Sequence, residues 1–242
     1  MTRKQEDPDW LDYFSGGVPT GEFFRMTLDD LTKTINRSAR GMNRVNEVCF
    51  IGLVSYFEAF CKDHFASILN IEPTLLVPLR DNGQDTQIDP ARLLEFQEQW
   101  DIKLGFLVAE KFDFGTAQKI NALYGSLLKI TPFSKDEANY YEGILRDRNL
   151  LVHHGGTFTL TYATQTKFLL KSHAARPFLD SLVISPDYFD ERLEFIKGIA
   201  RKTLKATHSA LHAHIEKSGA SYSGERLKAV DAFLWWDDGP EI

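Results

Sequence analysis

The segment from residue 134 to residue 156 constrains the fold most, because the sequence marks both ends of a long helix there. Ser134 and Glu137 have the spacing of a capping box, in which the two side chains bond each other's backbone N–H groups at a helix start. Gly155 has the position of the glycine that commonly ends a helix. The segment therefore predicts one helix whose last turn holds two adjacent histidines, where the helix dipole favours positive charge.

A basic residue interrupts the apolar stripe of this helix. At about 100° of rotation per residue, Arg148 falls in the middle of the stripe. The stripe consists of Tyr141, Ile144, Leu145 and Val152. A guanidinium on a core-facing stripe is costly unless it is paired, hydrated in a cleft or placed at an interface, so we expect Arg148 to have a partner. Leu150 is predicted to project opposite the stripe, which an interface with another molecule would explain.

Arg148 has polar neighbours at helical spacing. Asn149 and His153 are four residues apart and share a face at the edge of the stripe. Arg146 stands seven residues before His153 and nearly in line with it, and His154 follows directly. Spacing alone predicts a cluster of arginine, asparagine and histidine at the end of the helix. Arg146 and His154 are secondary candidates for functional residues in this cluster.

The run Arg148-Asn149-Leu150-Leu151-Val152-His153 resembles the motif of HEPN domains, which is Arg, a polar residue, three variable residues and His. Residues 48–63 look like the long helix near the start of HEPN domains in the branch related to RNase-L-type and phage-defence proteins. The resemblance covers roughly residues 45–216 and implies a mainly α, HEPN-like helical bundle that forms a homodimer in which two motif helices meet. One sub-branch has a tyrosine two residues after the motif histidine, where this chain has Gly155, so a modification of that tyrosine does not carry over.

The same resemblance implies a metal-independent endoribonuclease in a toxin or phage-defence setting, with no cofactor and a site made from both copies. The 2′-hydroxyl of the RNA would attack the adjacent phosphate and leave a 2′,3′-cyclic phosphate and a 5′-hydroxyl. His153 would move the proton, Arg148 would stabilise the charge on the phosphorane, and Asn149 would orient His153 or the phosphate. A partner protein such as an antitoxin fits that setting.

Two alternatives to a nuclease site stay open. In the first, the cluster is structural: Arg148 pairs with a buried carboxylate such as Glu58, and the histidines merely cap the helix. In the second, the chain is a non-catalytic HEPN-like module that serves in dimerisation or RNA sensing.

Composition places limits on the class of protein. With 242 residues, of which 43% are hydrophobic and 26% charged, the chain can bury a sizeable core in one domain. A net charge of −6 argues against a broad basic surface that coats nucleic acid, although it allows a small local site. No apolar run approaches the roughly 20 residues of a membrane span, and the N-terminus lacks a secretory signal, so we expect a cytoplasmic protein. Cys49 and Cys61 lie too far apart on one predicted helix to form a disulfide and are expected to be buried.

Three regions are predicted along the chain. Residues 1–26 are polar and turn-rich and predict an N-terminal arm. Residues 27–218 form the helical domain, with Thr27 as the expected N-cap of its first helix. Residues 219–242 form a short helix and an acidic tail.

The pattern changes after the motif helix. Alternation from Phe158 to Tyr162 predicts a strand, and residues 178–184 are its expected partner in a small β-hairpin insertion. A long amphipathic helix then begins near Pro186 and ends before Gly219.

This last long helix carries three histidines. His208 and His212 are four residues apart and share a face, and His214 follows. Because no acidic residue or cysteine stands near them at ligand spacing, they are interpreted as surface histidines, and no metal site is predicted.

Overall fold

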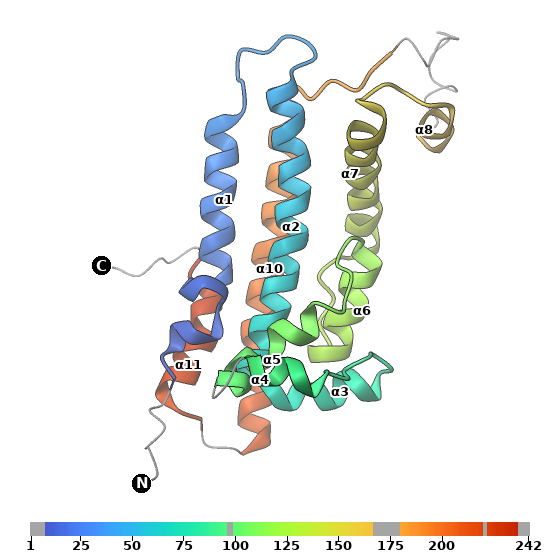
Figure 1. The fold of residues 1–242 in the computed structure, drawn as a ribbon. Coiled ribbons are helices and arrows are strands. Elements are labelled where there is room, and N and C mark those ends of the chain that lie inside the picture. Colours follow the sequence, from blue (N-terminus) through green and yellow to red (C-terminus); the bar gives the residue numbers. More distant parts are fainter. Residues whose placement is uncertain (1–7, 96–98, 167–179, 220–221, 237–242) are drawn as a thin grey trace.

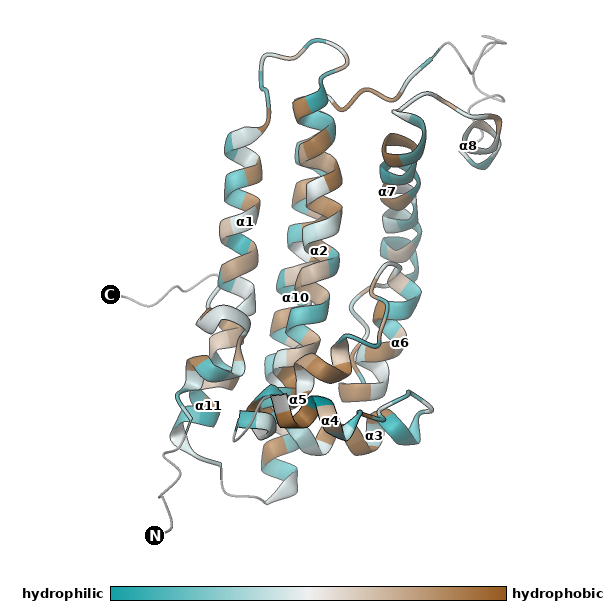
Figure 2. Cartoon of the chain, in the orientation of Figure 1, coloured by the Kyte–Doolittle hydropathy of each residue, from teal (hydrophilic) through white to brown (hydrophobic). Residues whose placement is uncertain are grey.

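The bundle is built around α2 (Arg44–Ile71), a helix of 28 residues that contacts α1, α5, α7 and α10 (Figure 1). The computed structural model describes residues 8–95, 99–166, 180–219 and 222–236. Apolar side chains occur on almost every side of α2 and join one continuous core, which is the environment expected for a helix without a polar face. Figure 2 shows hydrophobic residues along this helix and along α5, which packs against it.

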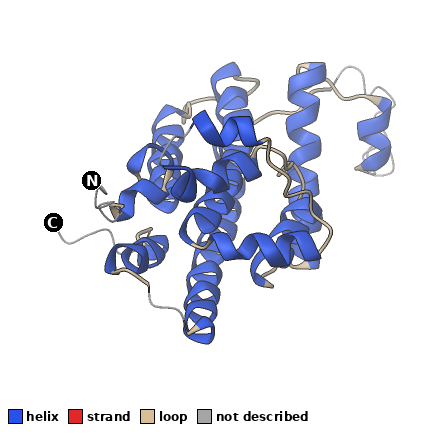
Figure 3. Cartoon of the chain, turned by 60° about the horizontal axis from the view of Figure 1, so that its bottom comes forward, coloured by secondary structure: helices blue, strands red, loops and turns tan. Residues whose placement is uncertain are grey.

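The other helices surround α2, and the prediction of a mainly α fold is confirmed. In chain order the described elements are η1 (Trp10–Tyr13), η2 (Ser15–Gly17), α1 (Thr20–Thr34), α2, η3 (Pro73–Leu75), α3 (Leu76–Asp81), α4 (Pro90–Glu95), α5 (Trp100–Ala109), α6 (Ala117–Leu128), α7 (Lys135–His154), α8 (Leu160–Gln165), α10 (Pro186–Ser218), α11 (Gly224–Asp231) and η6 (Ala232–Leu234). Figure 3 shows helices and loops, and no strand, in the parts of the chain that it describes. Among the described helices, none is both long and apolar enough to cross a membrane.

Buried polar side chains on α2 attach it to its neighbours. Asn46 donates to the carbonyl oxygen of Ile184 at 3.1 Å, and Asn70 donates to that of Tyr13 at the same distance. Asn70 also accepts a hydrogen bond from the backbone N–H of Gly105 at 2.7 Å. Since a buried polar group without a partner destabilises the folded state, these contacts hold segments distant in sequence against α2 in one arrangement.

The crossing of α2 and α5 depends on a glycine. A Cβ atom at Gly105 would lie 1.9 Å from the carbonyl oxygen of Ala66, far inside van der Waals contact. The absence of a side chain therefore allows the two backbones to approach closely, and a larger residue would force the helices apart.

The predicted ends of α7 are confirmed. Ser134 caps the helix with its side chain, and Glu137 accepts from the Ser134 backbone N–H at 2.7 Å, completing the capping box. Gly155 has a φ of 58°, in the left-handed region, and donates to the carbonyl oxygen of Leu151. His153 and His154 stand in the last turn as expected.

The hairpin prediction is wrong for the described residues. In place of a strand, residues 160–165 form the helix α8, which is capped by the Thr159 side chain. The aromatic rings of Phe158, which precedes this helix, and Tyr162, which lies within it, stack with centroids separated by 5.2 Å. Among the described residues, β-pairing here consists of one isolated antiparallel bridge between Thr157 and Ser181. The alternating pattern is short enough to fit a helical turn as well as a strand, and the Thr159 cap favours the helix. Residues 178 and 179 of the predicted partner strand lie outside the described residues.

The ends of the chain belong to the bundle more closely than predicted. Helix α1 begins at Thr20, so Thr27 is not its N-cap and the expected boundary at residue 26 falls inside this helix. Trp10 and Tyr13 are buried in the common core, which makes this part of the predicted arm a packed segment. The predicted C-terminal short helix is present as α11 and η6, whose packing buries Phe233, while the acidic residues after 236 lie outside the described residues.

Candidate functional site

Arg148 is the predicted phosphate-binding residue at the end of α7, and its side chain points toward α2. Its Nη2 atom lies 3.7 Å from Oε2 of Glu58, and its Nη1 atom donates to Oδ1 of Asn149 at 3.0 Å. Both partners of the ion pair are partly exposed. The distance to Glu58 is that of an ion pair and is too long for a good hydrogen bond, so Arg148 keeps donor capacity for another acceptor.

Glu58 is the carboxylate that the structural alternative named. Burial raises the pKa of Glu58, the positive charge of Arg148 lowers it, and the nearby carboxylate of Asp113 raises it. The net direction is upward, so burial and Asp113 outweigh the attraction of the guanidinium. Arg148 therefore has an acidic neighbour, as expected, but not one that satisfies the guanidinium through hydrogen bonds.

Exposed apolar residues lie between the Arg148–Glu58 ion pair and the end of the bundle. Val48, Ile51 and Glu58 stand three and seven residues apart on α2 and share one face, while Val152 stands one turn after Arg148 on α7. Because Glu58 and Arg148 are in contact, these two faces lie side by side, and we call the five residues the α2–α7 strip. Val48 is 66% exposed and Val152 48% exposed. The strip thus combines a charged pair with uncovered apolar surface.

Two of the apolar residues within the motif are placed opposite to prediction. Val152, expected in the buried stripe, is exposed, whereas Leu150, expected at an interface, is only 3% exposed. Figure 1 shows α8 beside the end of α7, on the side away from α2. A hydrogen bond from Tyr162 to Asp147 joins this helix to α7, and its Ala163 is buried. Leu150 is therefore not available to an interface with another molecule, whereas Val152 is.

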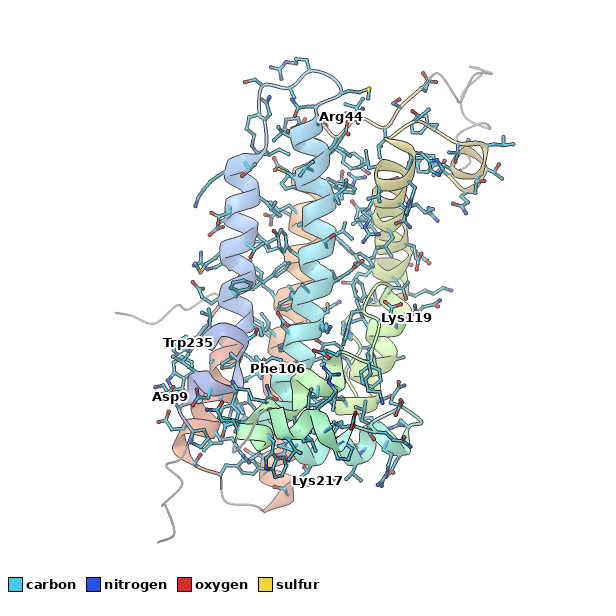
Figure 4. The ribbon with its side chains drawn as sticks, in the orientation of Figure 1. Asp9, Arg44, Phe106, Lys119, Lys217 and Trp235 are labelled. Carbon is cyan, nitrogen blue, oxygen red and sulfur yellow. The ribbon has the colours of Figure 1, made fainter. Side chains whose placement is uncertain are left out.

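His153 and Asn149 share an exposed face of α7, as their spacing predicts. His154 is exposed as well. Arg44, the first residue of α2, is labelled in Figure 4 and donates to the carbonyl oxygen of Gly155 at 3.4 Å. Five residues separate Arg148 from His153, which corresponds to about 140° around a helix. Arg148 and His153 therefore diverge within one chain, and in the described residues no hydrogen bond joins His153 to Arg148 or Asn149.

A carboxylate that sequence reasoning missed anchors the end of α7. Asp147 accepts hydrogen bonds from the hydroxyl groups of Tyr162 on α8, at 2.6 Å, and Tyr188 on α10. Burial is the largest cause that raises the pKa of both tyrosines, and the charge of Asp147 raises it further. The Arg192 guanidinium lies over the Tyr188 ring at 3.6 Å, a cation–π contact. The tyrosines are 15 and 41 residues from Asp147, so no pattern of neighbouring residues predicts these hydrogen bonds.

Arg146, one of the two secondary candidates, is partly buried and lies near this anchor. Its charge lowers the pKa of Tyr162, against the larger effects of burial and Asp147. The structure thus brings Arg148 and Asn149 together, leaves His153 and His154 exposed one turn later, and places Arg146 close to the α8 side of the helix. Chemically, the exposed end of α7 offers a guanidinium, an amide and two imidazoles, which suits an anionic ligand.

Side chains with metal-binding chemistry meet elsewhere, toward the other end of α10. The carboxylate of Asp231 on α11 lies beside His208 and His212, so the expectation that no acidic residue accompanies these histidines is wrong. Sequence spacing does not reveal this contact because Asp231 stands 19 residues beyond His212, on a different helix. Cys49 and Cys61 are free and buried, as expected.

Comparison with known proteins identifies no relatives. No protein-family model matches the chain, and searches of curated proteins and of solved structures found no match either.

Proposed function

We propose that the chain is a metal-independent endoribonuclease of the HEPN type, active as a homodimer. The observation that carries the proposal is the placement of Arg148, Asn149 and His153 on the exposed end of one helix, with Arg148 and Asn149 in hydrogen-bond contact. Arginine and histidine are the side chains that RNA cleavage through the 2′-hydroxyl needs, one to hold the phosphate and one to move a proton.

Each residue has a role that its position supports. The guanidinium of Arg148 would form paired hydrogen bonds with the scissile phosphate, for which its long contact with Glu58 leaves donors. His153 would take the proton from the 2′-hydroxyl or return one to the leaving 5′-oxygen, and its exposure allows access to RNA. Asn149, already in contact with Arg148, would keep the guanidinium oriented.

The divergence of Arg148 and His153 within one chain favours a site made from two copies. The exposed apolar residues of the α2–α7 strip lie at the same end of the bundle as the motif, where a second copy would cover them. A two-fold interface places the same residues on both sides, so the motif helices of the two copies would meet there. Such an interface could place His153 of one copy near Arg148 of the other.

The decisive experiment compares purified wild-type protein with His153→Ala and Arg148→Ala on total RNA. Fragments with 2′,3′-cyclic phosphate ends should appear with wild type, in the presence of a chelator as well as without one, and should be absent with both variants. His214→Ala, a histidine on α10 outside the site, should cleave like wild type. Circular dichroism establishes that each variant is folded. Cleavage that survives both site substitutions would refute the proposal.

A second experiment addresses the dimer. Val48→Asp places a charge on the α2–α7 strip, and should produce a folded monomer without cleavage activity. Val77→Asp is the matched control, because Val77 is similarly exposed but lies on α3, toward the other end of the bundle. Sedimentation gives the oligomeric state, and a wild-type monomer that cleaves RNA would contradict the two-copy site.

A non-catalytic role in dimerisation or RNA sensing is the second candidate, and the Arg148–Glu58 ion pair favours it. If the pair is structural, Glu58→Gln should lower the stability of the fold, and wild-type dimers should bind RNA but leave it intact. If the site is catalytic, Glu58→Gln should keep cleavage, because the guanidinium is then freer to bind phosphate.

Expression in cells also distinguishes a nuclease from a non-catalytic module. A nuclease toxin should slow growth when it is expressed in the cytoplasm, and His153→Ala should not. An antitoxin-like partner would relieve the effect.

A further inference from the structure

His208 and His212 lie one turn apart on α10 and share a carboxylate. The Oδ1 atom of Asp231, the last residue of α11, accepts from Nε2 of His208 at 3.1 Å and from Nε2 of His212 at 2.9 Å. The two imidazole rings are close, with centroids 4.4 Å apart. One oxygen atom therefore joins two imidazoles that come from a different helix.

This geometry is close to that of a bound metal ion. The three candidate ligand atoms lie within 4.8 Å of one another. Around a tetrahedral zinc ion with bonds of about 2.0–2.1 Å, neighbouring ligand atoms are about 3.3 Å apart. The separations between nitrogen and oxygen already approach that value, so a small rotation of the side chains would admit an ion between them.

We propose that His208, His212 and Asp231 form a binding site for a divalent transition-metal ion, with zinc as its most suitable occupant. Two imidazole nitrogens and one carboxylate oxygen suit zinc, whereas magnesium and calcium prefer shells made of oxygen. Each imidazole must offer an unprotonated Nε2 atom, so the proton there moves to Nδ1 or to solvent on binding. All three side chains are at least partly exposed, which leaves the fourth position to water.

The position of the site assigns it a structural role. Helix α11 and the following η6 contribute Val230 and Phe233 to the core, and α11 also contacts η1 near the N-terminus. Helix α10 ends at Ser218 and α11 begins at Gly224, so a metal bound to both helices would hold the C-terminal segment on the bundle. Far from the end of α7, the ion would stabilise the fold without taking part in chemistry there.

A metal-binding measurement on the full chain tests the inference. Metal-free protein is titrated with zinc chloride by calorimetry, and thermal unfolding is followed with zinc and with magnesium. We expect one zinc ion per chain and a rise in melting temperature with zinc alone. His212→Ala and Asp231→Asn should each weaken binding by about tenfold or more and abolish the rise. His214→Ala, on the same helix but outside the group, should bind as wild type does.

A second readout separates a metal site from a simple ion-pair cluster. Cobalt bound at a four-coordinate site should give an intense visible absorption band, which zinc displaces and which Asp231→Asn lacks. Asp231→Asn retains the shape of the side chain, so the variant is expected to fold. Wild-type protein that binds no zinc, or zinc binding that is equal in wild type and in His212→Ala, would overturn the inference and leave the group as an ion-pair contact between two helices.

Discussion

Acid should destabilise the protein through His64, a histidine enclosed in the core. The ring is fully buried between two threonines, with Nδ1 3.3 Å from Oγ1 of Thr20 and Nε2 3.0 Å from Oγ1 of Thr207. It is therefore a contact point of α1, α2 and α10. Burial lowers the pKa of His64 from 6.5 to about 3, because the imidazolium would lose its hydration in the core.

The sign and size of the effect follow from this pKa. Between pH 6.5 and about 3 the unfolded chain binds a proton at His64 that the folded chain does not, so stability falls as the pH decreases through this range. The slope approaches about 1.4 kcal/mol per pH unit, which makes the loss about 2 kcal/mol by about pH 5. Glu58 and Asp63 have raised pKa values and act in the opposite sense.

Urea denaturation near pH 7 and near pH 5 measures this loss. The contribution of the carboxyl groups cancels when wild type is compared with His64→Gln, which keeps hydrogen-bonding capacity toward both threonines but does not titrate. Wild type should lose about 2 kcal/mol more than His64→Gln over this range. Thr207→Val, which removes a hydroxyl group but keeps the histidine, should be less stable at both pH values and retain the wild-type difference. Equal losses in wild type and His64→Gln would refute the reasoning.

The other predictions concern backbone approach and the anchor of α7. Gly105→Ala should lower the free energy of unfolding by more than about 3 kcal/mol, because the new Cβ collides with the Ala66 carbonyl oxygen; a stable variant in urea denaturation would disprove the close approach. Gly198→Ala, at an exposed position of α10 with open space around it, should instead raise stability by about 0.5–1 kcal/mol in the same assay. Asp147→Ala leaves the hydroxyl group of Tyr188 without its acceptor and should lower stability by about 2 kcal/mol, with faster amide exchange in α8; unchanged exchange would show that Asp147 does not anchor it.

Helix ends were predictable because the groups that form them are close in sequence. Ser134 and Glu137 satisfy each other's backbone groups over three residues, and Gly155 ends α7 through its own backbone conformation. The start of α4 is equally local, since the Asp89 side chain accepts from the backbone N–H of Ala91. Interactions over one helical turn form in the same way wherever the segment lies in the fold, so a reader of the sequence can find them.

The face that each helix buries was less predictable near α8. The segment from Thr157 to Tyr162, in which threonine alternates with apolar side chains, is compatible with a strand and with a helix, and its environment determines which one forms. Within the motif, Leu150 is buried and Val152 is exposed, the reverse of expectation. Helical periodicity does not specify which neighbours pack on each face of a helix, so it placed these two residues wrongly.

Periodicity and capping are properties of neighbouring residues. They determine the helical class of the fold and the limits of α7, and with them the basic, amide and imidazole groups at the end of this helix. Three contacts depended on how the helices pack around α2. They are the ion pair of Arg148 with Glu58, the hydrogen bonds of Asp147 with its tyrosines, and the contact of Asp231 with His208. Those contacts join residues far apart in the chain. Their positions are determined by the shape of the whole core, to which every buried side chain contributes, and no local pattern contains that information.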